Sequence, residues 1–270
     1  MAYDLGAVAR LTTTVTDADG NPANAGNMAL TITLPDDTTV TVDPVTPAST
    51  GTYVFAYTTA QPGRHIVRWL GTGANPAAST DVFDVREAVP VAIVSLADAK
   101  KQLNIDPSET GDDDEIRGMI TGASLAVERE LGTVVARRVF TERRTASRDG
   151  RLLLSHVPVL ALTSVQSAAG ATTWDTSDLA VDTATGLITA ATGAPLTGDV
   201  DVTHTAGLRI VPDDYQLATL IIVQHLWDTQ RGRYGAVPGG SQEPEYVTGR
   251  GFAIPRRAIE LLDTTLPGVA

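Results

Sequence analysis

The chain has no cysteine among its 270 residues. This absence excludes disulfide bonds, metal sites built on thiolates and cysteine nucleophiles. Long apolar runs are missing too: stretches such as residues 220–223 are far shorter than the roughly 20 residues that span a bilayer. The first ten residues include Asp4 and no apolar segment, so they do not resemble a signal peptide. We therefore expect a soluble protein without a membrane partner.

Aromatic and basic residues are scarce. Aromatic residues make up 5% of the chain, with three tryptophans and six tyrosines, and they form no cluster of the kind that stacks on sugars. Twenty lysines and arginines face 32 aspartates and glutamates, which gives a formal net charge of −12. Because such a chain repels phosphate backbones, general nucleic-acid binding is disfavoured.

Enzyme motifs are missing as well. The sequence has no phosphate-binding glycine loop and no Gly-x-Ser-x-Gly turn. The four histidines lie on different expected elements without metal-ligand spacing: His65, His156, His204 and His225. His225, beside Trp227, is interpreted as a core or interface residue rather than a general base. We expect no catalytic activity, no metal ion and no cofactor.

Short runs rich in threonine, valine and aromatic residues fill residues 1–86, and turn residues separate them. Six or seven strands at this spacing predict a β-sandwich. Tyr53, Phe55 and Tyr57 alternate on one face, and Ile66 and Trp69 are expected in the core. Residues 17–21 have calcium-loop spacing without the closing glutamate, so a hairpin turn is favoured over a cation site. Residues 87–93 are the expected linker.

Two helices joined by an acidic segment open the second part. Ser95 can cap a helix at 95–103, and Pro107 and Gly111 interrupt it. Residues 112–115 are all acidic and lie at the start of a helix at 114–131. Unpaired N–H groups at a helix start favour negative charge. Helix-dipole complementation is favoured there over a divalent cation site. Gly132 ends the helix after a single apolar stripe.

Gly118 and Gly122 form a strip of small residues on this second helix. A glycine inside a helix costs about 0.5–1 kcal/mol relative to alanine, so two of them suggest a purpose. We expect another helix to approach closely, from the same chain or from a neighbouring subunit; the sequence leaves both alternatives open.

A β-rich insert at about 139–207 follows, and its start is rich in arginine, including Arg137, Arg138, Arg143 and Arg144. Three interpretations stay open: an exposed face balanced by local carboxylates, a surface for an acidic partner, or the lining of a DNA passage. After the insert, Pro212 begins a helix at 213–230 that is apolar around most of its circumference.

A segment rich in glycine and proline at 232–251 predicts a flexible arm, and a last helix at 255–266 follows it. Ile259 and Leu262 are expected to form the apolar face of that helix.

Several of these stretches resemble known families. Residues 95–106 (SLADAKKQLNID), the acidic cluster and the helix ending AVERELG resemble the head–tail connector (adaptor) proteins of long-tailed bacteriophages, over residues 94–266. The insert, with WDTSDLAVD, GLI and VTHTAG, resembles the longer connectors, in which it projects from the helical body. DADGNP, GTYVFAY and PGRHIVRW in the first part resemble bacterial and phage immunoglobulin-like domains.

The connector resemblance implies a structural virion protein in the neck between head and tail, assembled in the host cytoplasm. It implies a homo-oligomeric ring of about twelve copies, with the portal protein above and a head-closure or tail-terminator protein below. DNA would at most pass through the ring. The C-terminal helix and arm would dock on the portal. The alternative function is a surface-binding module for carbohydrate or protein that uses the immunoglobulin-like domain.

The expected fold class is therefore α+β with several domains. An immunoglobulin-like β-sandwich at 1–86 and a linker at 87–93 precede a connector domain at 94–270, which is a small helical bundle with an inserted β-rich region. The residues expected at interfaces are Gly118, Gly122, Arg137, Arg138, Arg143, Arg144, Trp227, Arg256, Arg257, Ile259 and Leu262.

Overall fold

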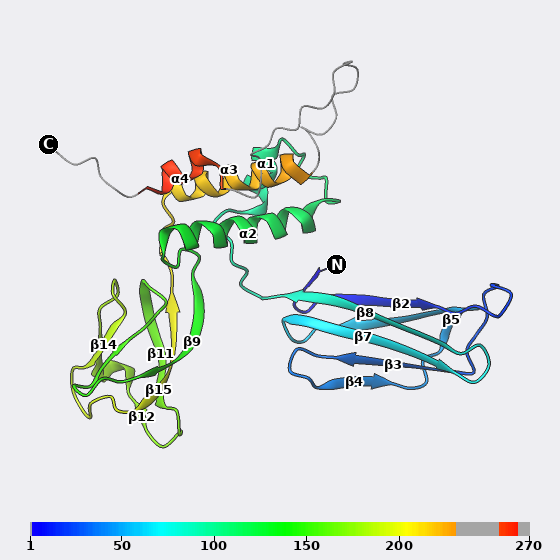
Figure 1. Cartoon of the computed structure of the whole chain (residues 1–270), viewed down its shortest axis with the longest axis horizontal. Helices are drawn as coiled ribbons and strands as arrows, with labels where there is room; N and C mark the ends of the chain where they lie inside the picture. Colours follow the sequence, from blue (N-terminus) through cyan, green and yellow to red (C-terminus); the bar gives the residue numbers. More distant parts are fainter. Residues whose placement is uncertain (1, 231–253, 264–270) are drawn as a thin grey trace, which may run out of the picture. The chain divides into compact units, whose positions relative to one another are not determined.

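The computed structural model describes residues 2–230 and 254–263, and it divides the chain into two compact units, Met1–Pro90 and Val91–Ala270 (Figure 1). Helices and several sheets are both present, so the fold class is α+β. The arm expected at 232–251 lies outside the described residues, as does the end of the helix expected at 255–266.

The first unit consists of two β-sheets that share one core, the arrangement of a β-sandwich. One sheet has the order β1-β8-β7-β3-β4, in which β1 runs parallel to β8, and the other has the order β2-β6-β5. The strands are β1 (Ala2–Asp4), β2 (Val8–Thr14), β3 (Asn27–Thr33), β4 (Thr39–Val42), β5 (Pro47–Ser49), β6 (Thr52–Thr58), β7 (Gly63–Thr72) and β8 (Ala77–Arg86).

Alternation along β7 decides which of its side chains enter this core. His65, Val67 and Trp69 are buried, whereas the side chains between them face solvent. The expectation that Ile66 joins the core is therefore wrong: Ile66 is 44% exposed because it has the opposite parity to Trp69. In the tight turn after β2, the Asp17 carboxylate accepts hydrogen bonds from the backbone N–H groups of Asp19 and Asn21. Thr16 and Pro22 pair across this turn, whereas β2 and β3 belong to different sheets.

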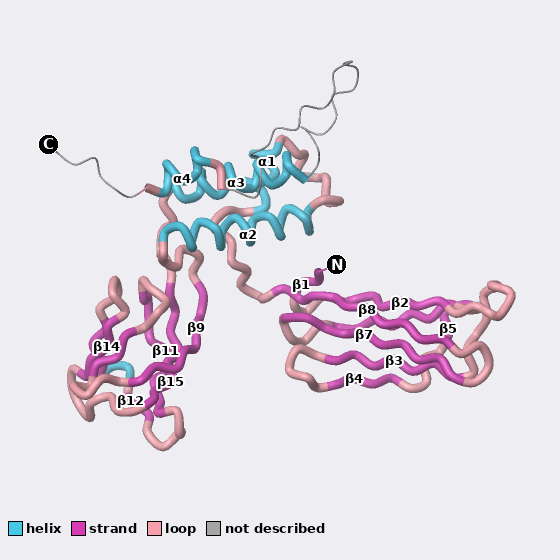
Figure 2. Tube along the Cα trace, viewed as in Figure 1, coloured by secondary structure: helices cyan, strands magenta, loops and turns pink. Residues whose placement is uncertain are grey.

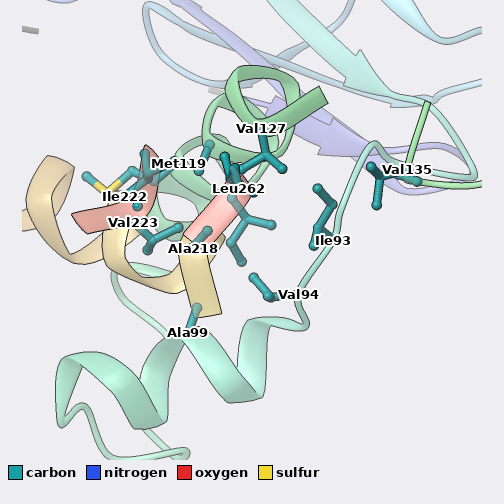
Figure 3. Close-up of a cluster of buried hydrophobic side chains, with 14 of the residues drawn as sticks. Ile93, Val94, Ala99, Met119, Val127, Val135, Ala218, Ile222, Val223 and Leu262 are labelled. Atoms are coloured by element: carbon teal, nitrogen blue, oxygen red, sulfur yellow. The ribbon is translucent and has the colours of Figure 1, made fainter. Parts of the chain in front are cut away.

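Within the described residues, four helices form the body of the second unit (Figure 2). They are α1 (Leu96–Leu103), α2 (Asp113–Leu131), α3 (Asp213–Gln230) and α4 (Arg256–Leu262). α3 packs against the other three. Figure 3 shows the core that they share, in which Ile93 and Val94 of the entering chain meet side chains such as Met119, Ile222 and Leu262.

The helix ends follow the capping residues in the sequence. The Ser95 hydroxyl accepts a hydrogen bond from the Asp98 N–H at 3.0 Å and so caps α1. α2 ends at Gly132, whose φ of 65° suits a residue without a Cβ.

Lys100 organises the connection between α1 and α2. Its side chain is buried, and its ammonium group donates to the carbonyls of Pro107 and Glu109 and pairs with the carboxylate of Asp113. A buried ammonium group is tolerated because three acceptors replace its water. Asp113, one member of the acidic cluster, is thereby engaged by a cation of the protein itself.

The insert carries two further sheets, of order β12-β11-β15-β9 and β10-β14-β13, and has its own apolar core. Its strands are β9 (Arg138–Thr145), β10 (Arg151–Leu153), β11 (Val159–Ser167), β12 (Thr173–Trp174), β13 (Leu179–Val181), β14 (Leu187–Ala190) and β15 (Asp199–Ala206). A short 3-10 helix, η1 (Thr176–Asp178), precedes β13.

The carboxylate of Glu128 joins α2 to the insert. Its side chain is only 8% exposed and accepts four hydrogen bonds. The backbone N–H groups of Val135 and Ala136 donate at 2.9 Å each, and the Arg138 guanidinium donates twice, at 2.8 and 2.7 Å. The last turns of α2 and the first residue of β9 therefore share one buried ion pair.

Glu128→Gln tests this joint. Glutamine is close in shape but carries no charge, so the Arg138 guanidinium, 18% exposed, loses its counter-ion. Removal of one partner from a buried pair costs about 3–5 kcal/mol, and we expect a loss of this order in calorimetry of the full chain. Glu130→Gln, at an exposed position on the same helix, is the control. Equal melting of the two variants would show that the pair does not hold the joint.

The same pair predicts a pH dependence. Burial alone would raise the pKa of Glu128, but the hydrogen bonds from Arg138, Ala136 and Val135 outweigh it and hold the pKa below its ordinary value of 4.5. A carboxyl with a lowered pKa stabilises the fold above its ordinary pKa, and this contribution is lost as the pH falls through the lower folded value. The stability difference between wild type and Glu128→Gln should thus be full at pH 6 and shrink below about pH 4. A difference that stays constant down to pH 2 would contradict this account.

Candidate functional site

The four arginines expected at interfaces near the start of the insert have different surroundings, because side chains alternate between the two faces of β9. Arg138 is used inside the chain, in the pair with Glu128. Arg143 lies on the exposed face of β9 and binds Asp201 of β15 through two hydrogen bonds of 2.7 and 2.8 Å. On the inner face, Arg144 donates to Glu142 at 2.8 Å.

Local carboxylates thus balance three of the four arginines, which favours the first of the three interpretations. Arg137 is exposed.

The exposed face of α2 carries Gly118 and Gly122. A Cβ added at either glycine would meet no described atom within 4 Å. The alternative in which a helix of the same chain packs on this strip is therefore wrong for the part of the chain that the structure describes. Leu125, 38% exposed, lies one turn further along the helix. This face therefore presents two glycines and a partly exposed leucine.

Trp227 is half-buried and packs against the helical core. Leu217, on the same helix, is 41% exposed. On α4, Ala258 and Leu262 lie one turn apart and both face the core. The expectation that Ile259 shares this apolar face is wrong, since Ile259 is 38% exposed. Leu262 is therefore a core residue, and Ile259 belongs to the outer surface of α4.

The outer surface of α4 is basic. Arg256 is almost fully exposed and pairs with Glu260 at 3.2 Å, a contact that contributes little in water. Arg257 is exposed and lines a pocket of about 370 Å³ with Pro255 and side chains of α3. The pocket's α3 residues are Ile221, Gln224, His225, Asp228 and Thr229.

A cluster that the sequence did not predict lies in the insert. Glu142, His156 and His204 each offer a possible ligand atom, and these atoms all lie within 4.8 Å of one another. Glu142 Oε1 is 3.4 Å from Nδ1 of His156 and 3.6 Å from Nε2 of His204. The spacing of the three residues along the chain carries no signal, because two different strands and a loop bring them together.

Burial and hydrogen bonds together set the pKa values of Glu142 and His204. Burial alone would raise the pKa of Glu142, but hydrogen bonds from the Ser155 N–H, Arg144 and His156 outweigh it and leave the pKa below its ordinary value. Burial lowers the pKa of His204, and its contact with the His156 carbonyl offsets only part of this effect. At neutral pH the cluster thus contains a carboxylate beside a neutral, buried imidazole.

None of the described helices is long and apolar enough to cross a membrane. A search of curated proteins found no match to the chain.

Three solved structures of gene transfer agent (GTA) particles are similar. A chain of the neck of an empty GTA particle, computed with C6 symmetry, is 22% identical, with 66% of this chain and 91% of that chain covered and a TM-score of 0.44. A chain of the virion of a native GTA particle is 21% identical, with 67% and 96% covered and a TM-score of 0.45. A chain of the native neck, computed with C12 symmetry, is 23% identical, with 67% and 96% covered and a TM-score of 0.44.

The family comparison covers the whole second unit apart from its ends. The matching family model is described as "HCP: Head completion protein", and it spans residues 92–264. This range includes the four helices, the insert and the Glu128 joint. The chain belongs to the head completion protein family.

Proposed function

We propose that this chain is a structural subunit of the neck of a tailed-phage-like virion, where it forms a ring between the portal and the head-closure or tail proteins. The observation that carries the proposal is the family match over residues 92–264. The role is one of assembly rather than catalysis. Its partners are other copies of the chain, the portal protein above and a head-closure or tail-terminator protein below.

The ring has about twelve copies, the number that the connector resemblance implies. A ring needs a head-to-tail contact, in which one patch of each copy meets a different patch of the next. The strip of Gly118 and Gly122 supplies one such patch, because it is exposed and lets another helix approach closely. The close packing suggested by the two glycines is then satisfied by a neighbouring copy.

The basic surface of α4 serves contacts with an acidic neighbour. Arg256, Arg257 and Arg137 are exposed on a chain whose net charge is −12, so they suit an acidic patch on the portal or on the next copy. Ile259 adds an apolar contact on α4, near Arg256 and Arg257. DNA passes through the ring without specific binding, because the subunit as a whole repels phosphate.

The first unit is an immunoglobulin-like domain attached to this ring subunit. Its compactness and its own core support independent folding. A second function, as a surface-binding module, has one feature in its favour: a groove of about 630 Å³ lined by residues of β2 and β8, among them Thr12, Thr14 and Thr80. The groove offers hydroxyl groups and little stacking surface, since Trp69 and Phe83 in its lining are buried and Tyr3 is only partly exposed.

Deletion of residues 1–90 tests whether the second unit alone folds and forms the ring. We expect residues 91–270 to fold and to form the same ring as the full chain, because each unit has its own core. Circular dichroism and sedimentation velocity measure the two properties. A shortened chain that folds but no longer assembles would mean that the first unit belongs to the ring contact.

Gly122→Leu tests the strip on α2. The isolated subunit should melt at the same temperature or slightly higher, because leucine has space there and favours a helix by about 0.5–1 kcal/mol over glycine. Ring formation and co-purification with the portal should fail, because the added side chain holds the neighbouring helix away.

Gly122→Ala is the matched control, since alanine raises helix propensity in the same way but adds one methyl group. It should assemble far better than Gly122→Leu. If Gly122→Leu assembles as well as the wild type, the strip is not an interface.

A further inference from the structure

The pairing of β9 and β15 brings Glu142 and His204 to one face of the sheet. Phe140 lies opposite His204, and Glu142 lies opposite Val202, so all four side chains share the inner face. Glu142 and His204 are diagonal neighbours on this face, close enough for long side chains to meet. The outer face of the same strands is used by pairs such as Arg143 with Asp201.

His156 joins them from the segment after β10. Its ring stacks on the ring of Phe140, with centroids 3.8 Å apart and planes 11° apart. The stacking fixes the imidazole so that Nδ1 faces Glu142 Oε1. Three elements therefore converge on one oxygen atom.

The distances match the edges of a coordination polyhedron. Ligand atoms about 2.1 Å from a tetrahedral ion lie about 3.4 Å from one another. Glu142 Oε1 is 3.4 Å from one imidazole nitrogen and 3.6 Å from the other. As direct hydrogen bonds these contacts are long, whereas they fit two ligand–ligand edges around an ion.

The surroundings hold the carboxylate in place. Glu142 Oε2 accepts from Arg144 at 2.8 Å, and the Ser155 N–H lies 3.1 Å from both oxygens. Such outer contacts orient a ligating carboxylate and leave Oε1 directed at the imidazoles. The Arg144 guanidinium pairs with Oε2 of this carboxylate, the oxygen away from the histidines.

One side of the cluster is open. The side chain of His156 is 39% exposed, whereas Glu142 is 10% exposed and His204 is fully buried. An ion can therefore enter beside His156 and keep water as its fourth ligand. Two imidazoles and one carboxylate favour zinc and its neighbours in the first transition series over magnesium or calcium, which prefer oxygen ligands alone.

We propose that Glu142, His156 and His204 bind a divalent transition-metal ion of the zinc class. The ion fastens the segment around His156 to β9 and β15. The same segment meets the end of α2: the Val157 carbonyl accepts from the Val134 N–H and the Thr133 hydroxyl at 2.8 Å each, and the Pro158 carbonyl accepts from the Gly207 N–H. Metal binding therefore stiffens the connection between the helices and the insert. This site does not depend on the proposed function.

The test uses the full chain without a histidine tag, stripped with a chelator, and titrated with zinc chloride by calorimetry. One ion should bind per chain and raise the melting temperature, and magnesium chloride should do neither. Cobalt chloride should give the visible absorption of a site with nitrogen and oxygen ligands. Absence of zinc binding at micromolar concentrations, or an equal effect of magnesium, would overturn the proposal.

Two histidine variants locate the ion. His156→Ala removes the exposed ligand and should weaken zinc binding by about a hundredfold. His225→Ala, which removes a half-buried histidine of α3, should bind zinc like the wild type. In the presence of chelator both variants should keep a cooperative melting transition, which shows that they are folded; His156→Ala should melt somewhat lower because it loses the stacking on Phe140. Equal zinc affinity of the two variants would place the ion elsewhere and refute the site.

Discussion

The second unit depends on one buried carboxylate. Glu128 accepts four hydrogen bonds at the point where α2 ends and the insert begins, and two of them come from backbone groups that no strand ladder satisfies. Burial of a charge is costly unless every lone pair finds a donor, so the geometry of this junction is tightly specified. The insert is thereby attached to the helical body by a defined contact rather than by a flexible hinge. If the proposed function is correct, this defined contact fixes the insert on the helical body of each ring subunit.

Because side chains alternate along a strand, the two faces of the sheet formed by β9 and β15 differ in character. The outer face of β9 and β15 carries polar pairs, such as Arg143 with Asp201 and Thr141 with Thr203, which suit a solvated surface. The inner face carries the apolar core together with Glu142 and His204. His156 joins these two residues from the loop after β10. Because the period of a strand is two, each arginine of the run has a different environment from its neighbour.

Helix positions could be predicted from the sequence because caps and apolar periods are local. Ser95, the acidic residues around the start of α2, Gly132 and Pro212 mark the starts of α1, α2 and α3 and the end of α2 close to where the structure has them. The predictions are wrong where the buried face of a strand or helix had to be told from its exposed face. Ile66 is expected in a core, but its parity along β7 turns it outward. Ile259 is expected on the apolar face of the last helix with Leu262, but Ala258 takes that place and Ile259 is exposed. The histidine cluster could not be found, because it depends on the register of β9 with β15 and on a loop.

The central claim is that copies of this chain meet through the small-residue face of α2 in the ring of a virion neck. Cryo-electron microscopy of a neck assembled from this chain and its portal tests it most directly. The account predicts a closed ring of identical copies in which a helix of the next copy lies in van der Waals contact with Gly118 and Gly122. A ring in which this face of α2 is exposed to solvent, or a neck without a ring of this chain, would contradict it.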